Sequence, residues 1–392
     1  MKLNKLKISP INKELIEFSC AVDNKKMFAK FSIDYKSYLF ETYDSFLINI
    51  LPMAMVKGED IYIDGSISRK LLFNIENYLL DILYIMIPHA KKIKITAKKL
   101  LDYNLSDHTL KDRIISSPLS CGIDSLFTLE KYYFQEKEKK NKISFVINSF
   151  SGAHADLDIY KNRLINIKQY VQKTSLNILE VETNFASFNK INHRLSHIFR
   201  NLSVPLIFQK LIKRYLYPST FSYLNTLLKK DMETCQFDPV ILPLISTELI
   251  DFVSDGAERS RVSKTEIISK NKLSQIHLDV CTNSDYMKSK NKKINCSYCS
   301  KCLRTMLALE SHDCLNEFEN VFNIKKYKKL KTSFIQQIKA SKHPNDIEIY
   351  NFIKTKNKSI LNEKKIITQI KNYKFFVKIS KLITKFKNIL NN

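Results

Sequence analysis

The chain has 392 residues, of which 44% are apolar and 11% aromatic, and it carries a formal net charge of +25. This length allows two or three domains with sizeable cores, and the apolar content excludes a disordered chain. A mean hydropathy of −0.23 excludes a multi-span membrane protein, and the residues after Met1 contain no apolar run typical of a signal peptide. We therefore expect a cytoplasmic protein without a transmembrane segment.

Residues 1–110 are predicted to form a mixed α+β domain. Apolar and polar residues alternate over 27–33, which indicates a half-buried strand, and 60–67 and 91–97 are predicted as further short strands. Between these last two, apolar residues at gaps of three and four predict a helix over 72–86 that Pro88 ends. We interpret the nearby acidic residues Glu59, Asp60 and Asp64 as turn and strand-edge residues.

Residues 111–315 change to an alternation of strands and helices. Strands are expected over 114–118, 143–150 and 176–182, with helices over 125–134 and 157–172 between them. A helical passage over 192–214 and a strand over 219–224 are expected to follow. This succession predicts an α/β fold in which a parallel sheet is connected by crossover helices, with ligands bound at the carboxyl ends of the strands.

A loop follows the first of these strands and contains a candidate phosphate site, Ser120-Cys121-Gly122-Ile123-Asp124-Ser125. A strand-to-helix junction favours anion binding, because the first backbone N–H groups of the helix and its positive dipole end face the ligand. Asp124 is a candidate Mg²⁺ ligand, since a polyphosphate arrives with its metal. The alternative is an ordinary turn with an N-cap. The loop lacks the Gly-Lys-Ser/Thr ending of a Walker A motif.

Four of the eight cysteines lie within 22 residues and predict a metal centre. Cys296, Cys299 and Cys302 have the spacing C-x2-C-x2-C, and fourteen residues separate Cys281 from Cys296. Four thiolates complete the tetrahedral coordination of Zn²⁺ and leave no open position, so we predict a structural zinc site. An iron–sulfur cluster is the main alternative, because thiolates bind it as well.

The loop at 120–125 resembles the S-G-G-x-D-S signature of the PP-loop ATP pyrophosphatases, with Cys121 in place of the first glycine. Together with the cysteine spacing and Arg304 two residues after Cys302, it makes residues 112–312 similar to 7-cyano-7-deazaguanine synthase of queuosine biosynthesis. The resemblance implies an adenine nucleotide alpha hydrolase-like fold. It also implies that ATP is split into AMP and pyrophosphate, with Ser120, Cys121, Gly122, Ile123, Asp124 and Ser125 forming the ATP-binding loop.

The segment 261–268 resembles the S-K-x-E-I-I segment of the same enzymes. Ser263 is expected to cap a helix with Glu266 as its capping-box partner, so that Lys264 projects from the first turn. Arg261 and Lys264 are therefore candidate catalytic cations, with Asp124, that neutralise phosphate charge during transfer. The alternative is that both are solvated residues at the start of a helix.

Several histidines are weaker candidates. His154 and Asp156 follow the second predicted parallel strand at the expected ligand edge, where they are candidates for contact with nucleotide or substrate. His193 and His197 lie four residues apart and are followed by Arg200 and Asn201. Because no third metal ligand is evident, we interpret this segment as a helix face that lines the site.

Residues 316–392 are predicted to form a basic helical extension. Residues 321–392 hold 18 lysines and three acidic residues, and Phe375, Ile379, Leu382, Phe386 and Ile389 repeat at gaps of three or four. The alternatives for this amphipathic segment are packing on the chain's own body and contact with a polyanion, a membrane surface or a protein partner. Compositional drift in a lysine-rich chain also accounts for the charge.

The sequence thus predicts an ATP- and Mg²⁺-dependent, zinc-containing ligase that forms a carbon–nitrogen bond. A substrate carboxylate is adenylated, and ammonia or another amine then displaces AMP. Two alternatives stay open. One is a PP-loop enzyme that modifies RNA, similar to a tRNA thiolase, with Cys121 or Cys235 as sulfur carrier and the basic tail on phosphates. The other is a non-catalytic nucleotide-binding scaffold. The acceptor, the amine donor and the oligomeric state do not follow from the sequence.

Overall fold

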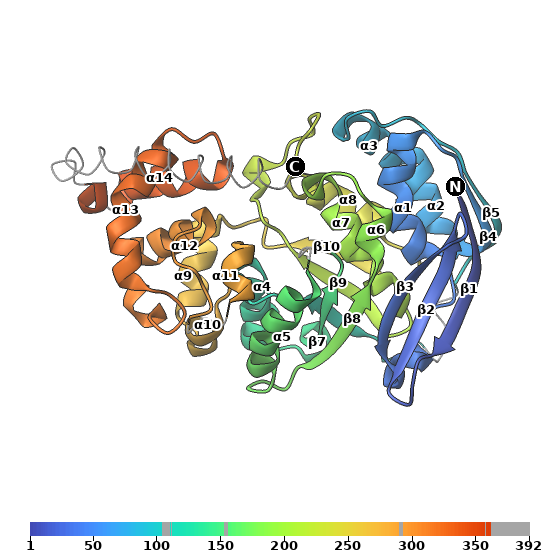
Figure 1. Cartoon of the computed structure of the whole chain (residues 1–392), viewed down its shortest axis with the longest axis horizontal. Coiled ribbons are helices and arrows are strands. Elements are labelled where there is room, and N and C mark those ends of the chain that lie inside the picture. The colour runs from blue at the N-terminus through green and yellow to red at the C-terminus, as the bar shows by residue number, and fades with distance from the viewer. Residues whose placement is uncertain (104–109, 111, 153–155, 290–292, 357, 362–392) are drawn as a thin grey trace, which may run out of the picture. The chain divides into compact units, whose positions relative to one another are not determined.

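The computed structural model describes the chain except residues 104–109, 111, 153–155, 290–292, 357 and 362–392 (Figure 1). It divides into two compact units, Met1–Ser260 and Arg261–Asn392. No helix in the described part is long and apolar enough to cross a bilayer. The predicted domains 1–110, 111–315 and 316–392 stay predictions, and the predicted helix over 375–389 lies outside the described residues.

The first unit is built on one ten-stranded sheet with the order β10-β9-β6-β7-β8-β3-β2-β1-β4-β5. The strands are β1 (Lys2–Pro10), β2 (Leu15–Val22), β3 (Lys25–Ser32), β4 (Ile61–Ser68), β5 (Ile95–Leu101), β6 (Ile114–Pro118), β7 (Ile143–Phe150), β8 (Asn177–Thr183), β9 (Ile212–Pro218) and β10 (Asp251–Asp255). The five strands from β10 to β8 run parallel to their neighbours, and β3 joins β8 in antiparallel pairing. The predicted α/β fold with parallel strands is therefore present.

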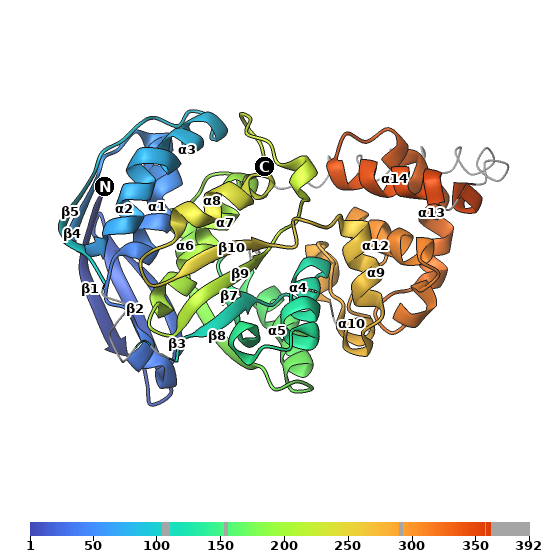
Figure 2. The same cartoon turned by 180° about the vertical axis from the view of Figure 1, so that it is seen from behind.

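Helices cover both faces of this sheet. They are α1 (Asp44–Lys57), α2 (Arg69–Asn74), α3 (Leu80–Met86), α4 (Ile123–Leu129), α5 (Leu157–Val171), α6 (Phe185–Phe188), α7 (His193–Ser203) and α8 (Asp238–Ile245). Figures 1 and 2 show α4 and α5 together on one face, and α1, α7 and α8 on the other. The ends of the parallel strands lie between the two helix layers, and α/β folds bind their ligands at the carboxyl ends of such strands.

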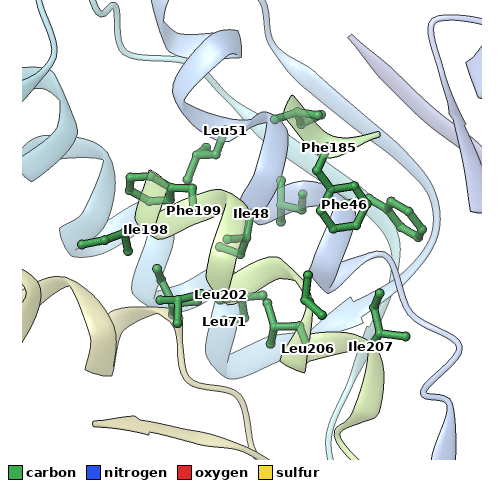
Figure 3. Packing of buried hydrophobic residues seen from close by; sticks show 14 of the residues in the cluster. Phe46, Ile48, Leu51, Leu71, Phe185, Ile198, Phe199, Leu202, Leu206 and Ile207 are labelled. Atoms are coloured by element: carbon green, nitrogen blue, oxygen red, sulfur yellow. The ribbon is translucent and has the colours of Figure 1, made fainter. Parts of the chain in front are cut away.

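The core of the first unit lies between α1, α7 and the sheet. Its most central side chains, shown in Figure 3, include Phe46, Ile48 and Leu51 of α1 and Ile198, Phe199 and Leu202 of α7. Phe46 also contacts Phe18 of β2 and Phe185, with ring centroids 5.3 and 6.1 Å apart. α1 is apolar almost all round and ends at Gly58, whose φ of 70° suits a glycine. The apolar run that includes 46–56 is thus a core helix.

The second unit is helical around the cysteine cluster. Its helices are α9 (Arg261–Ser269), α10 (Lys272–His277), α11 (Ser284–Lys288), α12 (Ser300–Ser311), α13 (Ile324–Lys339) and α14 (Pro344–Lys356). Met306 of α12, Tyr327 of α13 and Ile353 of α14 are fully buried. A buried ion pair between Arg304 and Asp346 joins α12 to α14, with Nε 2.7 Å from Oδ1. These helices form a body in which both apolar packing and one internal charge pair fix the geometry.

Most predicted elements are confirmed, and three details are wrong. The predicted strands over 114–118 and 143–150 coincide with β6 and β7. The predicted strand over 219–224 is wrong, because the strand is Ile212–Pro218, where we expected the end of a helix. The predicted strand over 91–97 begins only at Ile95. Helix α9 begins at Arg261, so Ser263 lies within its first turn and is not the predicted N-cap.

Candidate phosphate loop and metal centre

The candidate phosphate loop follows β6, the central strand of the parallel part. The chain leaves β6 through α4 to β7 on one side, while β9 on the other side is reached only after β8 and α7. The strand order therefore reverses at β6, and such a switch point is the usual ligand position in an open α/β sheet. Two hydrogen bonds fix the loop to β7: Leu119 N–H donates to Ile147 O (3.1 Å), and Asn148 Nδ2 donates to Leu119 O (2.8 Å).

Within the loop, two serine hydroxyls lie close together. Ser120 Oγ is 3.2 Å from Ser125 Oγ, Gly122 N–H donates to Ser120 Oγ (3.3 Å), and Ser125 Oγ donates to Gly122 O (3.1 Å). Gly122 is the N-cap of α4, so no side chain caps this helix in the described structure. Ser120 is exposed, and Gly122 and Asp124 are half-buried. Two hydroxyls, a carboxylate and the start of a helix are thus gathered at the carboxyl end of β6.

Cys121, the departure from the family signature, has a left-handed backbone with φ of 55°, which only glycine adopts without strain. Its side chain is fully buried, and that of Ile123 is 4% exposed. Burial, with a smaller contribution from Cys121, raises the pKa of Tyr170 on α5, so the thiol lies on the α5 side of the loop. Buried and exposed side chains thus alternate along the loop, and the thiol belongs to the buried set.

Other polar groups of the first unit surround the ends of the neighbouring strands. Asp238 Oδ1 accepts from Ser219 Oγ (3.2 Å) and Ser254 Oγ (3.0 Å). Burial raises the pKa of Tyr217 at the end of β9, and the charges of Asp238 and Asp124 add to this shift. Neither Tyr217 nor Asp238 was a candidate from the sequence, because their positions depend on tertiary contacts: β9 pairs with β6 and β10, and Asp238 accepts from Ser219 and Ser254.

A buried charge pair holds α4 against β10. Asp255 is buried and accepts from Thr128 Oγ1 (2.7 Å) and from Lys131 Nζ (3.0 Å), and Lys131 also contacts the exposed Glu258 at 3.0 Å. Burial by itself lowers the pKa of Lys131, but the combined effect of Asp255, Glu258 and Tyr132 outweighs it and raises that pKa. The start of α4, and with it the loop, is therefore fixed relative to the end of β10.

We expect Asp255→Ala to lower the free energy of unfolding by about 2–4 kcal/mol, because Thr128 and Lys131 lose their buried acceptor. Glu258→Ala is the matched control and should cost at most about 1 kcal/mol, because that ion pair is exposed. Urea unfolding followed by circular dichroism measures both. Equal effects of the two variants would contradict a role for Asp255 in holding α4.

The four cysteines of the second unit come together as predicted and can bind a metal ion such as zinc. Their sulfur atoms all lie within 4.8 Å of one another. Cys302 Sγ is 3.4 Å from Cys299 Sγ and 3.8 Å from Cys296 Sγ. Sulfur atoms at about 2.3 Å from a tetrahedral zinc ion are about 3.8 Å apart, so the spacing fits this metal. The described residues contain no other comparable group of metal-binding side chains.

The backbone around the cysteines is arranged for thiolates. Cys299 N–H donates to Cys296 Sγ (3.3 Å) across a turn in which Ser297 has a φ of 62°. Cys299 is the N-cap of α12 and Cys302 lies in its first turn, where the helix dipole favours negative charge. Each of these features stabilises the deprotonated sulfur that a metal requires.

Asn295 connects the two parts of the cysteine motif. Its Oδ1 accepts from Val280 N–H (2.9 Å), and its Nδ2 donates to Leu278 O (2.8 Å). The residue before Cys296 is thus bonded to the residues before Cys281. Asn295 was not a sequence candidate, although a buried asparagine beside a metal motif is a common way to join two ligand-bearing loops.

The remaining candidates are dispersed. Arg261 and Lys264 belong to the second unit, where Lys264 is 1% exposed, so the alternative of a solvated residue does not hold for Lys264. Their contact with phosphate stays a prediction. Asp156 caps α5 by accepting from Asp158 N–H (2.8 Å), whereas His154 lies outside the described residues. Asp60 Oδ1 accepts a hydrogen bond from Lys94 N–H, and Asp64 forms an ion pair with Lys98, as expected for turn and strand-edge residues.

His193 and His197 lie on α7, with ring centroids 5.3 Å apart and Nδ1 of His197 3.0 Å from the carbonyl oxygen of His193. Desolvation, with the nearby His197 and Arg200, lowers the pKa of His193 to about 4, so the ring is neutral at pH 7. No third metal-binding side chain joins them in the described structure. This pair is therefore part of a helix face and not a metal site.

Comparison with known proteins gives no family. No protein-family model matches the chain, and no curated protein and no solved structure matches it. The functional argument therefore depends on the site residues and on the sequence motifs alone.

Proposed function

We propose that this chain is an ATP-dependent enzyme that adenylates a carboxylate and passes the acyl group to an amine. The observation that carries the proposal is the position of Ser120–Ser125 at the end of the central parallel strand, where the strand order reverses. Open α/β sheets bind their ligands at such a switch point, and the start of the following helix can bind phosphate there. The resemblance to PP-loop ATP pyrophosphatases supplies the reaction class.

In this proposal the loop binds the two outer phosphates. Ser120 and Ser125 donate their hydroxyl groups, the first N–H groups of α4 bind phosphate oxygens, and Asp124 holds the Mg²⁺ that accompanies ATP. A carboxylate oxygen of the substrate attacks the α-phosphorus, the bond to the bridging oxygen breaks, and pyrophosphate leaves. Ammonia or another amine then attacks the acyl carbon and AMP leaves. The protein contributes positioning and charge stabilisation.

The four cysteines have a structural role in this proposal. A zinc ion on Cys281, Cys296, Cys299 and Cys302 would have four thiolate ligands and no position for water. It would join the segment before α11 to the start of α12. The four clustered cysteines and the use of ATP fit a reducing, cytoplasmic setting. Contact of the basic C-terminal extension with a polyanion stays part of the proposal.

The nature of the products tests the proposal. The purified protein is incubated with Mg²⁺, labelled ATP, ammonia and a panel of carboxylates that includes a deazaguanine carboxylate, the class that the resemblance suggests. We expect AMP and pyrophosphate in equal amounts. Formation of ADP and phosphate would indicate a different reaction, and failure to bind ATP at all would leave only the scaffold hypothesis.

The thiols offer a test of the sulfur-carrier alternative. Cys121 is fully buried, and Cys235 is 5% exposed and donates to Glu233 Oε2 at 3.4 Å. We expect both thiols in the folded protein to react with iodoacetamide at least about a hundredfold more slowly than in the urea-unfolded protein, because a buried thiol is inert. Mass spectrometry of the digested protein measures this. Rapid alkylation of either thiol would favour the thiolase-like alternative.

A further inference from the structure

Arg200 carries a buried positive charge that no carboxylate in the described part of the chain balances. The residue is 6% exposed. Its Nη2 donates to the carbonyl oxygens of Asn189 and, at 3.3 Å, of Ile191, while its buried Nε has no hydrogen-bond partner in the described structure. Burial lowers the pKa of Arg200, and no negative group offsets that shift. Because a buried guanidinium without a counter-ion is costly, its retention indicates a ligand that supplies the negative charge.

The helix that carries Arg200 divides into two faces. Ile198, Phe199 and Leu202 form the apolar face that packs against α1 (Figure 3). At 3.6 residues per turn, His193, His197 and Arg200 lie on the other side of α7. The core therefore holds the helix firmly and presents a stripe of nitrogen-containing side chains away from it. The two histidines beside Arg200 carry no negative charge, so they do not compete with an anionic ligand for the guanidinium.

Arg200 lies beside the loop that leaves the carboxyl end of β7. A Cβ atom on Gly152 would come within 3.1 Å of Arg200 Nη1, and Gly152 has a φ of 96° that favours glycine. The neighbouring residue Asn201 accepts from Ser151 Oγ (2.7 Å) and donates to the Tyr217 hydroxyl (3.1 Å). The charge of Asp124, in turn, contributes to the raised pKa of Tyr217. This sequence of contacts connects Arg200 to the same edge of the sheet as the phosphate loop.

We propose that Arg200 binds an oxyanion, a carboxylate or a phosphate group of a reactant, at the carboxyl edge of β7. The identity of that reactant rests on the proposed function: it is either the carboxylate of the acceptor or a phosphate of ATP. The guanidinium keeps Nη1 for the ligand, because Nη2 is held by the two backbone carbonyls and Nε is buried. Those carbonyl contacts fix the plane of the group before the ligand arrives, which favours affinity and orientation.

Nuclear magnetic resonance of the full-length protein tests this directly. The arginine Nε–H groups are labelled with ¹⁵N, and the Arg200 signal is identified by its absence in Arg200→Lys. Inorganic phosphate, benzoate and α,β-methylene-ATP with Mg²⁺ are then added separately. We expect a saturable shift of the Arg200 signal with at least one probe. The matched control is Arg194 on the same helix, which is exposed and pairs with Glu233 at 2.7 Å, and its signal should not move.

The pattern of responses identifies the source of the oxyanion. A response to the ATP analogue indicates a phosphate, whereas a response to benzoate alone indicates the acceptor carboxylate. Calorimetry should show the effective probe binding about tenfold more weakly to Arg200→Lys, which keeps the charge but lacks the planar fork, and unchanged in Arg194→Lys.

Different experimental results would overturn the Arg200 oxyanion site and the proposed function. Absence of a saturable Arg200 shift with all three probes overturns the inference, even if calorimetry shows that the ATP analogue binds elsewhere. A shift with phosphate or benzoate in a protein that binds no ATP analogue supports the oxyanion site and overturns the proposed function. An Arg194 shift equal to that of Arg200 would mean general ionic effects and would also overturn the inference.

Discussion

Replacing Cys302 by serine is expected to remove the metal from the protein and to loosen the second unit around it. Cys302 is fully buried, and its sulfur lies within 3.8 Å of those of Cys296 and Cys299. Zinc bound by cysteines in small structural sites contributes about 10–16 kcal/mol of apparent binding free energy, so loss of one of four ligands is a large perturbation. The zinc content measured by elemental analysis should fall from about one ion per chain to near zero.

The physical reason for the loosening is the scarcity of regular structure between Leu278 and Ser300. The described part of that segment contains one short helix, α11, and its hydrogen bonds to the rest include those of Lys293, Asn295 and Ser297. Without the metal, we expect a protease to cut this segment first. Limited proteolysis with identification of the fragments measures it, and a zinc chelator added to the wild-type protein should reproduce the pattern.

Cys314→Ser is the matched control. Cys314 is a buried thiol of the same unit that lies outside the cluster and donates to Leu309 O at 3.3 Å. This variant should keep its zinc and its resistance to proteolysis. Full metal content in Cys302→Ser, or equal loss in Cys314→Ser, would contradict a four-cysteine site. Iron and sulfide with a visible absorption band would identify an iron–sulfur cluster instead of zinc.

The elements that sequence patterns predicted well are those with a strong local signal. β6 and β7 are short apolar runs with clear boundaries, and residues 72–86 have helical spacing up to a proline. The cysteine cluster was predictable because its spacing is determined by the coordination chemistry of a metal. In each case the residues concerned lie close together in the sequence, so no long-range contact had to be known.

The elements that were wrong depend on tertiary contacts. β9 contains Lys213 and Arg214, which interrupt the apolar pattern of a buried strand, and it forms because it pairs with both β6 and β10. The predicted cap at Ser263 was a sound local pattern, but Val262 N–H at the start of α9 donates instead to Glu348 Oε1 of α14 at 2.6 Å. The acceptor of this N–H lies 86 residues away, which no short motif reveals.

The same reason explains which site residues were missed. Tyr217, Asp238 and Asp255 carry no motif of their own, and their positions follow from tertiary contacts: Tyr217 and Asp255 lie at the ends of the parallel strands β9 and β10, and Asp238 accepts from Ser219 and Ser254. Arg200 attracted notice only as a neighbour of two histidines. Its lack of a carboxylate partner is a property of the folded environment, and the sequence around it gives no indication of it.

Asp124→Asn is expected to reduce the rate of AMP formation by about 10²–10³-fold, because a neutral amide is a weaker ligand than a carboxylate for the Mg²⁺ that accompanies ATP. Asparagine has nearly the same shape, and Asp124 is half-buried in the first turn of α4, so the loop should keep its conformation. The rate of AMP release at saturating ATP measures the effect. Calorimetry should also show that Mg²⁺ no longer strengthens ATP binding.

Asp158→Asn provides the matched control, since Asp158 occupies the first turn of α5 and is exposed. It removes the same charge from the start of a neighbouring crossover helix and should leave both measurements unchanged. If the two variants lose activity equally, general electrostatics at the sheet edge is responsible and not metal binding by Asp124. If Asp124→Asn retains full activity, the loop does not hold the metal–phosphate complex, and the proposed adenylation has to use another part of the protein.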